Sequence, residues 1–302
     1  MAENVEELIA QLAAHNYLAD EGLATAIFLA IELERPLLLE GEAGVGKTEV
    51  AKVLSRWTGG ELIRLQCYEG IDVNQAVYEW DYTRQLLHLR TAEATGAATQ
   101  GAAEELENEL YSERFLVRRP LLEAIAPRTD GLRPVLLIDE VDRADDEFEA
   151  FLLEVLSEYA ITVPELGRFE AEHPPIVIIT SNRTRDVHDA LKRRALYHWV
   201  EHPDFDRELE ILRIKAPEVP ATLARQVAAA TAEIRSFGLY KPPGVAETID
   251  WATALNLIGA EGMTVNAADA TLGTLLKYRE DQMRVRGASL EEIVGKAISL
   301  TG

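Results

Sequence analysis

The sequence predicts an α/β domain, a parallel sheet with helices on both faces, followed by a smaller domain made only of helices. Three continuous apolar runs, 37–39, 135–138 and 176–179, have the length and composition of strands buried on both faces of a parallel sheet. After His202-Pro203 the helical period continues without a convincing strand, in segments 206–215, 221–236, 245–258, 265–283 and 290–299. We therefore expect an α/β domain over 1–202 and a helical domain over 203–302.

Composition limits the classes of protein that this chain can belong to. The chain has 302 residues, 47% of them hydrophobic, which is enough for a substantial core, and a formal net charge of −22. That charge disfavours nucleic acid and anionic membranes as partners. Cys67 is the single cysteine and cannot form an intramolecular disulfide. No apolar run approaches the roughly 20 residues that span a bilayer, and the N-terminus lacks a signal pattern, so we expect a cytoplasmic protein.

The remaining elements follow in order along the chain. Apolar residues at helical spacing predict a helix over 16–34, which Arg35-Pro36 ends. A helix is expected over 48–57, a strand over 62–67 and another strand over 196–200. An Ala/Glu/Gly-rich stretch, 91–113, has little periodic apolar content and is expected to be an exposed insertion, part loop and part helix.

A glycine-rich motif lies between the first apolar run and the helix that follows it. It reads G-x-x-x-x-G-K-T and consists of Gly41, Glu42, Ala43, Gly44, Val45, Gly46, Lys47 and Thr48. A strand before the motif and a helix after it are the context of a P-loop, whose backbone amides cradle phosphates. We expect ATP there, with Lys47 reaching the β- and γ-phosphates and Thr48 ligating Mg²⁺.

Polar residues end the two later apolar runs. Asp139 and Glu140 follow the run 135–138, as in a Walker B motif, where the aspartate holds Mg²⁺ and the glutamate polarises the attacking water. Asn182 follows the run 176–179, where its amide is expected to hold that water near the γ-phosphate. An acidic pair after a P-loop therefore predicts ATP hydrolysis.

Two arginines, Arg193 and Arg194, end a predicted helix just before the strand 196–200. Either one can act as a finger that reaches a neighbouring subunit's γ-phosphate and stabilises the transition state. The alternative is a solvated basic helix end that interacts with the helix dipole. The sequence does not choose between the two arginines.

Residues 198–202 match H-x-x-E-H, a zinc-protease pattern that requires both histidines on one helical face. The segment favours a strand and Pro203 follows at once. In a strand His198 and His202 would stand about 13 Å apart, so we do not expect a zinc site.

Together the P-loop, Asp139-Glu140, Asn182, the paired arginines and the helical C-terminal part resemble the AAA+ ATPases, and within them the MoxR class. The segment at about 70–82 is similar to that class's insertion into helix 2. The segment at about 160–171 is similar to its hairpin before sensor 1. The resemblance implies a homo-oligomer, with a hexameric ring as the family expectation, in which both insertions face the central pore.

Further motifs resemble the family of ATPases that mature carbon monoxide dehydrogenase; they lie at 35–40, 78–80, 180–185, 192–199 and 247–252. That resemblance implies a chaperone for a protein client, with a molybdenum hydroxylase as the candidate client, working beside a von Willebrand factor A domain protein. One departure concerns the helical domain, which in many AAA+ proteins carries a sensor 2 arginine. Segment 241–247 has none, and Lys241 is the candidate substitute.

Two other functions remain open at this level. One is a nucleotide-dependent regulatory switch with negligible turnover. The other is a nucleic-acid motor, which the net charge of −22 disfavours.

Overall fold

The structure is a computed structural model that describes residues 2–94, 103–129, 131–287 and 290–300. The chain divides into two compact units. The first consists mainly of residues 25–39 and 54–198, and the second of residues 2–24, 40–53 and 199–302.

A five-stranded parallel sheet is the main β structure, in the order β2-β5-β8-β1-β9. Its strands are β1 (Leu37–Gly41), β2 (Leu62–Gln66), β5 (Val135–Asp139), β8 (Ile176–Ser181) and β9 (Leu196–Val200). In register, Gln66 at the end of β2 lies opposite Asp139, and Ile138 lies opposite Ile179. All five predicted strands and the predicted fold class are confirmed.

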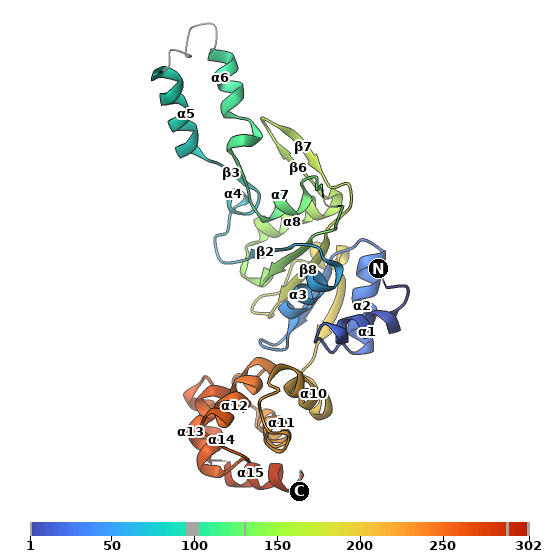
Figure 1. Ribbon diagram of the computed structural model, residues 1–302, viewed down its shortest axis with the longest axis vertical. Helices are drawn as coiled ribbons and strands as arrows, with labels where there is room; N and C mark the ends of the chain where they lie inside the picture. The colour runs from blue at the N-terminus through green and yellow to red at the C-terminus, as the bar shows by residue number, and fades with distance from the viewer. Residues whose placement is uncertain (1, 95–102, 130, 288–289, 301–302) are drawn as a thin grey trace. The chain divides into compact units, whose positions relative to one another are not determined.

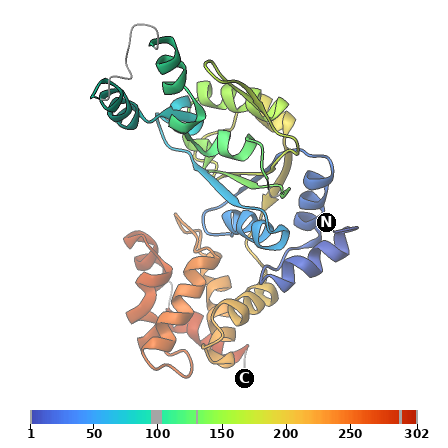
Figure 2. The same cartoon turned by 45° about the horizontal axis from the view of Figure 1, so that its top comes forward.

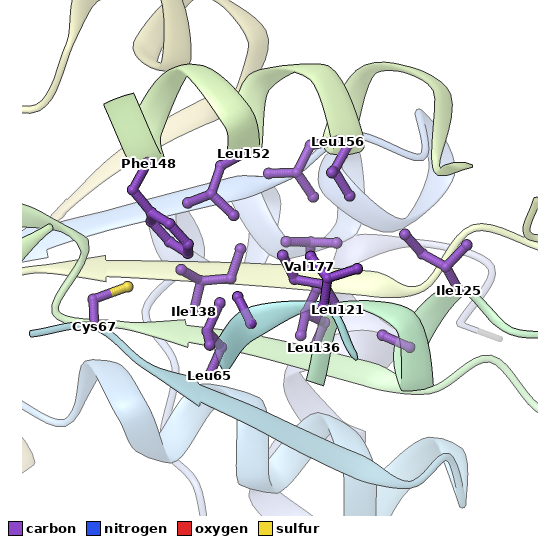
Figure 3. Packing of buried hydrophobic residues seen from close by; sticks show 14 of the residues in the cluster. Leu65, Cys67, Leu121, Ile125, Leu136, Ile138, Phe148, Leu152, Leu156 and Val177 are labelled. Atoms are coloured by element: carbon purple, nitrogen blue, oxygen red, sulfur yellow. The ribbon is translucent and has the colours of Figure 1, made fainter. Parts of the chain in front are cut away.

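Helices α7 (Pro120–Ile125) and α8 (Asp146–Glu158) supply apolar side chains to the core of the first unit. In Figure 3, Leu152 and Leu156 of α8 point toward Ile138 and Val177 of the sheet. The three-to-four-residue spacing of the apolar residues in α8 gives it one buried face, and Asp145 caps its start by accepting a hydrogen bond from the Phe148 amide at 2.8 Å.

A helical excursion lies between two short strands, β3 (Tyr78–Trp80) and β4 (Leu116–Arg118), which pair antiparallel. Short helix α4 (Val73–Ala76) precedes β3, and η1 (Glu113–Phe115) precedes β4. Between β3 and β4 the chain forms two helices, α5 (Tyr82–Ala94) and α6 (Ala103–Leu110), which lie side by side (Figure 1 and Figure 2). The Gln85 side chain joins the two helices by donating to the Leu110 carbonyl at 2.7 Å. The predicted insertion at 91–113 thus belongs to an excursion that starts at Tyr82; its residues 95–102 lie outside the described residues.

The predicted hairpin at 160–171 is present as β6 (Ala160–Val163) and β7 (Gly167–Glu170), paired antiparallel. Gly167 has φ +91°, a conformation that favours glycine, at the end of the turn.

Helices α1 (Val5–Ala14) and α2 (Glu21–Glu32) precede β1, and α3 (Lys47–Thr58) follows the P-loop. The predicted helix over 16–34 begins only at Glu21. Asp20 accepts a hydrogen bond from the Leu23 amide at 2.7 Å, which satisfies one of the amides that a helix start leaves without an intrahelical partner.

The C-terminal helices are α10 (Phe205–Lys215), α11 (Ala221–Arg235), α12 (Val245–Leu257), α13 (Val265–Leu275), α14 (Arg279–Gly287) and α15 (Leu290–Ser299). Their shared core surrounds fully buried Trp251, whose indole N–H donates to Thr271 Oγ1 at 2.8 Å. The prediction of one helix over 265–283 is wrong. The chain is extended at Leu276, with φ −110° and ψ 117°, which ends α13, and α14 begins only at Arg279.

Within the described residues, no helix is long and apolar enough to cross a membrane. Cys67 is a buried free thiol.

Candidate functional site

The P-loop connects β1 to α3 as expected. Gly41, Gly44 and Gly46 have φ of +156°, +84° and +94°, values that side-chain-bearing residues rarely adopt. At Gly41 an added Cβ would also lie 2.4 Å from the Val200 carbonyl oxygen. The glycines of the motif therefore allow a backbone path that other residues would strain.

Lys47 is buried and its ammonium group is turned back on the loop. Its Nζ donates to the Gly41 carbonyl at 2.8 Å and to the Glu42 carbonyl at 2.6 Å. The P-loop backbone thus surrounds the Lys47 ammonium group. Thr48 is the next residue, in the first turn of α3. Such a loop, at the N-terminal end of a helix, is a favourable place for the phosphates of a nucleotide.

Asp139 ends β5 as a buried carboxylate with partners on both oxygens. Oδ1 accepts a hydrogen bond from Thr180 Oγ1 at 2.6 Å, and Oδ2 accepts two from the Arg64 guanidinium, at 2.5 and 3.1 Å. Arg64 comes from β2 and Thr180 from β8, the two strands that flank β5. The carboxylate is therefore fixed in place from both sides.

Glu140 follows directly with a left-handed backbone, φ 55° and ψ 51°. This conformation costs a non-glycine residue roughly 1–3 kcal/mol and is offset by local bonds. The Glu140 amide donates to Thr180 Oγ1 at 2.9 Å. The carboxylate accepts from Gln66 Nε2 at 3.1 Å and pairs with Arg143 at 3.2 Å.

Asn182 follows β8, and its side-chain amide donates to Glu140 Oε1 at 3.3 Å. The two polar residues that the sequence singles out on neighbouring strands are thus brought together. Buried Asp142 organises this turn, because it accepts from the backbone amide of Asn182 at 3.2 Å and from the amide and hydroxyl of Thr184 at 2.8 and 2.6 Å.

The two candidate finger arginines end α9 (Asp189–Arg194), and their surroundings differ. The Arg194 side chain donates to the Ser157 hydroxyl on α8. Arg193 is exposed, and its side chain makes no hydrogen bond or ion pair within the described part of the chain. The backbone carbonyls of both accept hydrogen bonds from the Arg35 guanidinium, at 2.8 to 3.0 Å, which fixes the end of α9.

The residues of the H-x-x-E-H pattern lie at the end of β9 and just after it. His198 is in the strand, as predicted, and His202 follows it. The imidazole Nε2 of His202 lies 3.6 Å from Glu42 Oε2 of the P-loop. Burial, followed by the charge of Arg235, lowers the pKa of His202, which therefore favours the neutral imidazole. Among the described residues there is no cluster of three or more His, Cys, Asp or Glu side chains suited to a metal ion.

Lys241 is exposed in the loop before α12, and its backbone amide donates a hydrogen bond to Asp281 Oδ2 at 3.1 Å. The first turn of α12 contains Glu247 and no basic residue. Nothing in these contacts directs the Lys241 ammonium group toward the P-loop, so its role as a substitute for sensor 2 stays a prediction.

Sequence reasoning missed Arg64, Gln66, Thr180 and Asp142. A signal exists for the first two: Arg64 and Gln66 are polar residues two apart in a predicted strand, and so lie on one face of it. Thr180 and Asp142 carry no such signal, because a buried hydroxyl or carboxylate is identified only by the backbone amides and side chains that surround it.

The oxygen donors present fit Mg²⁺, which is bound in proteins by one or two carboxylates together with substrate phosphates. Asp139 supplies a carboxylate at the end of β5, and Thr48 supplies a hydroxyl in the first turn of α3.

The fold, the P-loop and the polar residues that follow β5 and β8 define a P-loop nucleotide-binding protein. Residues 36–195, more than half of the chain, match the model of the AAA domain (dynein-related subfamily). The chain therefore belongs to this family of AAA ATPases.

Two solved structures are similar to the chain, and the first of them supports the fold assignment. A mutant form of RuvB from Thermotoga maritima has a TM-score of 0.50 at 16% identity, over 91% of this chain and 73% of that one. A candidate ATPase from Cytophaga hutchinsonii has a TM-score of 0.46 at 13% identity, over 97% of this chain and 93% of that one. None of the curated proteins compared with the chain matches it.

Proposed function

We propose that the chain hydrolyses ATP at the edge of the sheet where β1, β5 and β8 end. In the order β2-β5-β8-β1-β9, these three strands are consecutive neighbours in a parallel sheet. Parallel strands end at the same edge, which is where ligands bind in open α/β sheets. The P-loop, the Asp139-Glu140 pair and Asn182 are the segments that follow these three ends.

The observation that carries this proposal is the paired arrangement of Glu140 and Asn182. A carboxylate that accepts from a neighbouring amide at 3.3 Å is suited to orienting a water molecule and taking its proton. The second carboxylate, Asp139, is fixed by Thr180 and Arg64 and serves the metal. Mg²⁺, when bound, neutralises charge on the phosphates.

Within this proposal, Lys47 and the P-loop amides bind the phosphates and Asn182 holds the water. Glu140 polarises that water for attack on the γ-phosphorus. Its left-handed backbone, fixed by Thr180, aims the carboxylate independently of the nucleotide.

The biological role that we propose is that of a MoxR-class chaperone, which uses ATP to remodel or mature a protein client. The β6–β7 hairpin and the α4–β3 segment support this proposal, because they occupy the two places where the resemblance to that class expects insertions. A molybdenum hydroxylase as client and a von Willebrand factor A domain protein as partner rest on the resemblance of the sequence. The similarity to RuvB, at 16% identity, extends to the fold alone and does not favour a nucleic-acid motor.

ATP turnover by the wild type and the Glu140→Gln variant tests the hydrolytic function. Loss of the carboxylate is expected to lower turnover by about 100-fold or more while ATP binding persists. Glu147→Gln, an exposed glutamate in the first turn of α8, is the matched control and is expected to turn over like the wild type. Negligible wild-type turnover at every protein concentration, with ATP still bound, would instead support the regulatory switch.

A further inference from the structure

The start of α12 contacts the P-loop through the backbone. The amide of Val245, the first residue of α12, donates to the carbonyl of Gly44 at 2.9 Å. Both residues belong to the second compact unit. A helix leaves its first amides without intrahelical partners, and here one of them is used on the P-loop.

The two chain segments approach so closely that side chains do not fit between them. A Cβ added to Gly244 would lie 2.6 Å from the Gly44 Cα, and a Cβ added to Gly44 would lie 2.8 Å from Glu247 Oε2. Real Cβ atoms essentially never come this close to other heavy atoms. Glycine at 244 is therefore required by the contact, because the atoms it meets belong to the backbone of Gly44, whereas glycine at 44 is favoured by its φ of +84°.

Residues outside the P-loop hold the start of α12 in place. Glu247 accepts from the Gly244 amide at 3.0 Å, and Thr248 Oγ1 lies 3.0 Å from the Gly244 carbonyl oxygen. Arg235 Nε donates to the Pro243 carbonyl at 2.8 Å, and its guanidinium is itself paired with buried Glu208. These hydrogen bonds fix the backbone around Gly244 and so hold the Val245 amide in place.

The Gly44 carbonyl and the Val45 N–H belong to one peptide unit. That unit is planar and trans, so its C=O and N–H point in opposite directions. Fixing the carbonyl on the α12 side therefore aims the Val45 N–H away from α12. Val45 lies within the G-x-x-x-x-G-K-T loop, whose amides bind phosphate oxygens in this class of site.

We propose that the backbone amide of Val245 is a positioning group for phosphate binding, which orients the Val45 amide by holding the carbonyl of the same peptide. This inference rests on the proposed function and deepens it. The helical region acts on the nucleotide site through the P-loop backbone, at the start of a helix whose first turn contains no basic residue.

The Val245→Pro variant tests the proposal, because proline has no N–H and its Cδ takes the place of the hydrogen that points to the Gly44 carbonyl. Proline is tolerated at the first position of a helix and requires an extended residue before it. Gly244 is extended, with φ −83° and ψ −177°. The same substitution at Val265 is the matched control, since Val265 is the first residue of α13 after Thr264, which is also extended. Val245→Ala, which keeps the N–H, is the conservative variant.

ADP affinity, measured by equilibrium titration, is the primary readout. Val245→Pro is expected to weaken ADP binding by at least about threefold, because the hydrogen bond is lost and the proline ring displaces the Gly44 carbonyl, while Val265→Pro and Val245→Ala bind like the wild type. The thermal unfolding midpoint without nucleotide shows that both proline variants are folded at the temperature of the titration. Equal ADP affinity of both proline variants would overturn the inference and leave the proposed function standing. No ADP binding by the wild type would overturn both.

A second pair of variants tests the close approach without proline. Gly244→Ala is expected to weaken ADP binding at least as much as Val245→Pro, because the added methyl group displaces α12 from Gly44. Gly295→Ala lies in α15, where an added Cβ meets nothing within 4 Å, and is expected to leave ADP affinity unchanged. Unchanged ADP affinity of Gly244→Ala would contradict the contact.

Discussion

At the scale of single residues, the acidic site depends on side chains that touch one another rather than on the nucleotide alone. Thr180 is central, because its hydroxyl donates to Asp139 and accepts from the amide of Glu140. The Thr180 side chain therefore positions both the carboxylate of Asp139, which is proposed to hold the metal, and the backbone of Glu140, whose carboxylate is proposed to polarise the water. We expect these two acids to keep their orientation without nucleotide.

Asp142 is expected to matter for turnover although it does not touch the nucleotide in the proposed arrangement. Asp142→Ala leaves the amides of Asn182 and Thr184 without their acceptor, which costs about 1–3 kcal/mol in unfolding free energy. The resulting movement of Asn182 is expected to lower kcat by roughly ten- to a hundredfold, with ADP affinity unchanged.

Steady-state turnover and ADP titration of Asp142→Ala measure these effects. Asp186→Ala removes an exposed carboxylate from the same loop region and is the control. If kcat stays at the wild-type value while the unfolding midpoint falls, Asp142 contributes to stability and not to turnover.

Cys67 is expected to be unreactive in the folded protein. Burial raises the pKa of its thiol to about 12, and the nearby Asp139 carboxylate adds to the rise. Because the pKa is raised, the thiol stays protonated at mildly alkaline pH, and the thiolate is the reactive species. Labelling by a thiol-specific reagent is expected to be slow in the folded state and fast in guanidinium chloride. Since Cys67 is the single cysteine, the whole signal belongs to it, and rapid labelling of the folded protein would contradict the burial.

At the scale of elements, an ionic network joins α10, α11 and α12. Both Nη atoms of Arg235 bind the Glu208 carboxylate, at 2.6 and 2.7 Å, and Thr248 donates to that carboxylate at 2.8 Å. The side chains of Arg235 and Glu208 are 11% and 1% exposed. A buried pair of this kind is costly to break from one side, because the remaining charge loses its partner.

Arg235→Leu is expected to destabilise the protein by about 3–5 kcal/mol, measured by urea unfolding. The double variant Arg235→Leu/Glu208→Leu is expected to lose less, since it leaves no unpaired charge. Lys296→Ala breaks an exposed ion pair with Glu233 and is expected to leave the unfolding midpoint nearly unchanged. Equal losses in the single and the double variant would show that the pair does not act as a unit.

At the scale of the whole molecule, the arginines at the end of α9 are the candidates for a contact with a second subunit. Arg194 is engaged with Ser157 of its own subunit, whereas the side chain of Arg193 makes no hydrogen bond or ion pair within the described residues. We therefore expect Arg193 to be the finger supplied to a neighbouring subunit of a ring, which the resemblance implies is hexameric.

Mixing Arg193→Ala with Glu140→Gln subunits tests this assignment. Each variant alone is expected to turn over very little, whereas the mixture regains turnover, because the arginine of a Glu140→Gln subunit acts on the ATP of an Arg193→Ala neighbour. Arg194→Ala is the matched variant: it is expected to lower the unfolding midpoint and to retain more turnover by itself than Arg193→Ala does. Light scattering of Glu140→Gln with ATP and Mg²⁺ measures the ring itself, and a monomer under those conditions would exclude a trans finger.

The sequence by itself determined the sheet and the positions of the chemically important residues along it. Continuous apolar runs as short as 135–138, rich in β-branched residues or leucine and bounded by polar residues, favour the interior of a covered parallel sheet, and the P-loop motif fixes where the chain turns into a helix. The same local signals located Asp139, Glu140 and Asn182 at strand ends.

Only the tertiary structure decided which residues support them. Arg64, Thr180 and Asp142 act through partners 40 to 75 positions away, and local spacing contains no information about such pairs. Local spacing also does not predict the break between α13 and α14 or the contact of Val245 with Gly44. Each depends on how separate segments pack, and packing is a property of the folded chain that a local pattern does not encode.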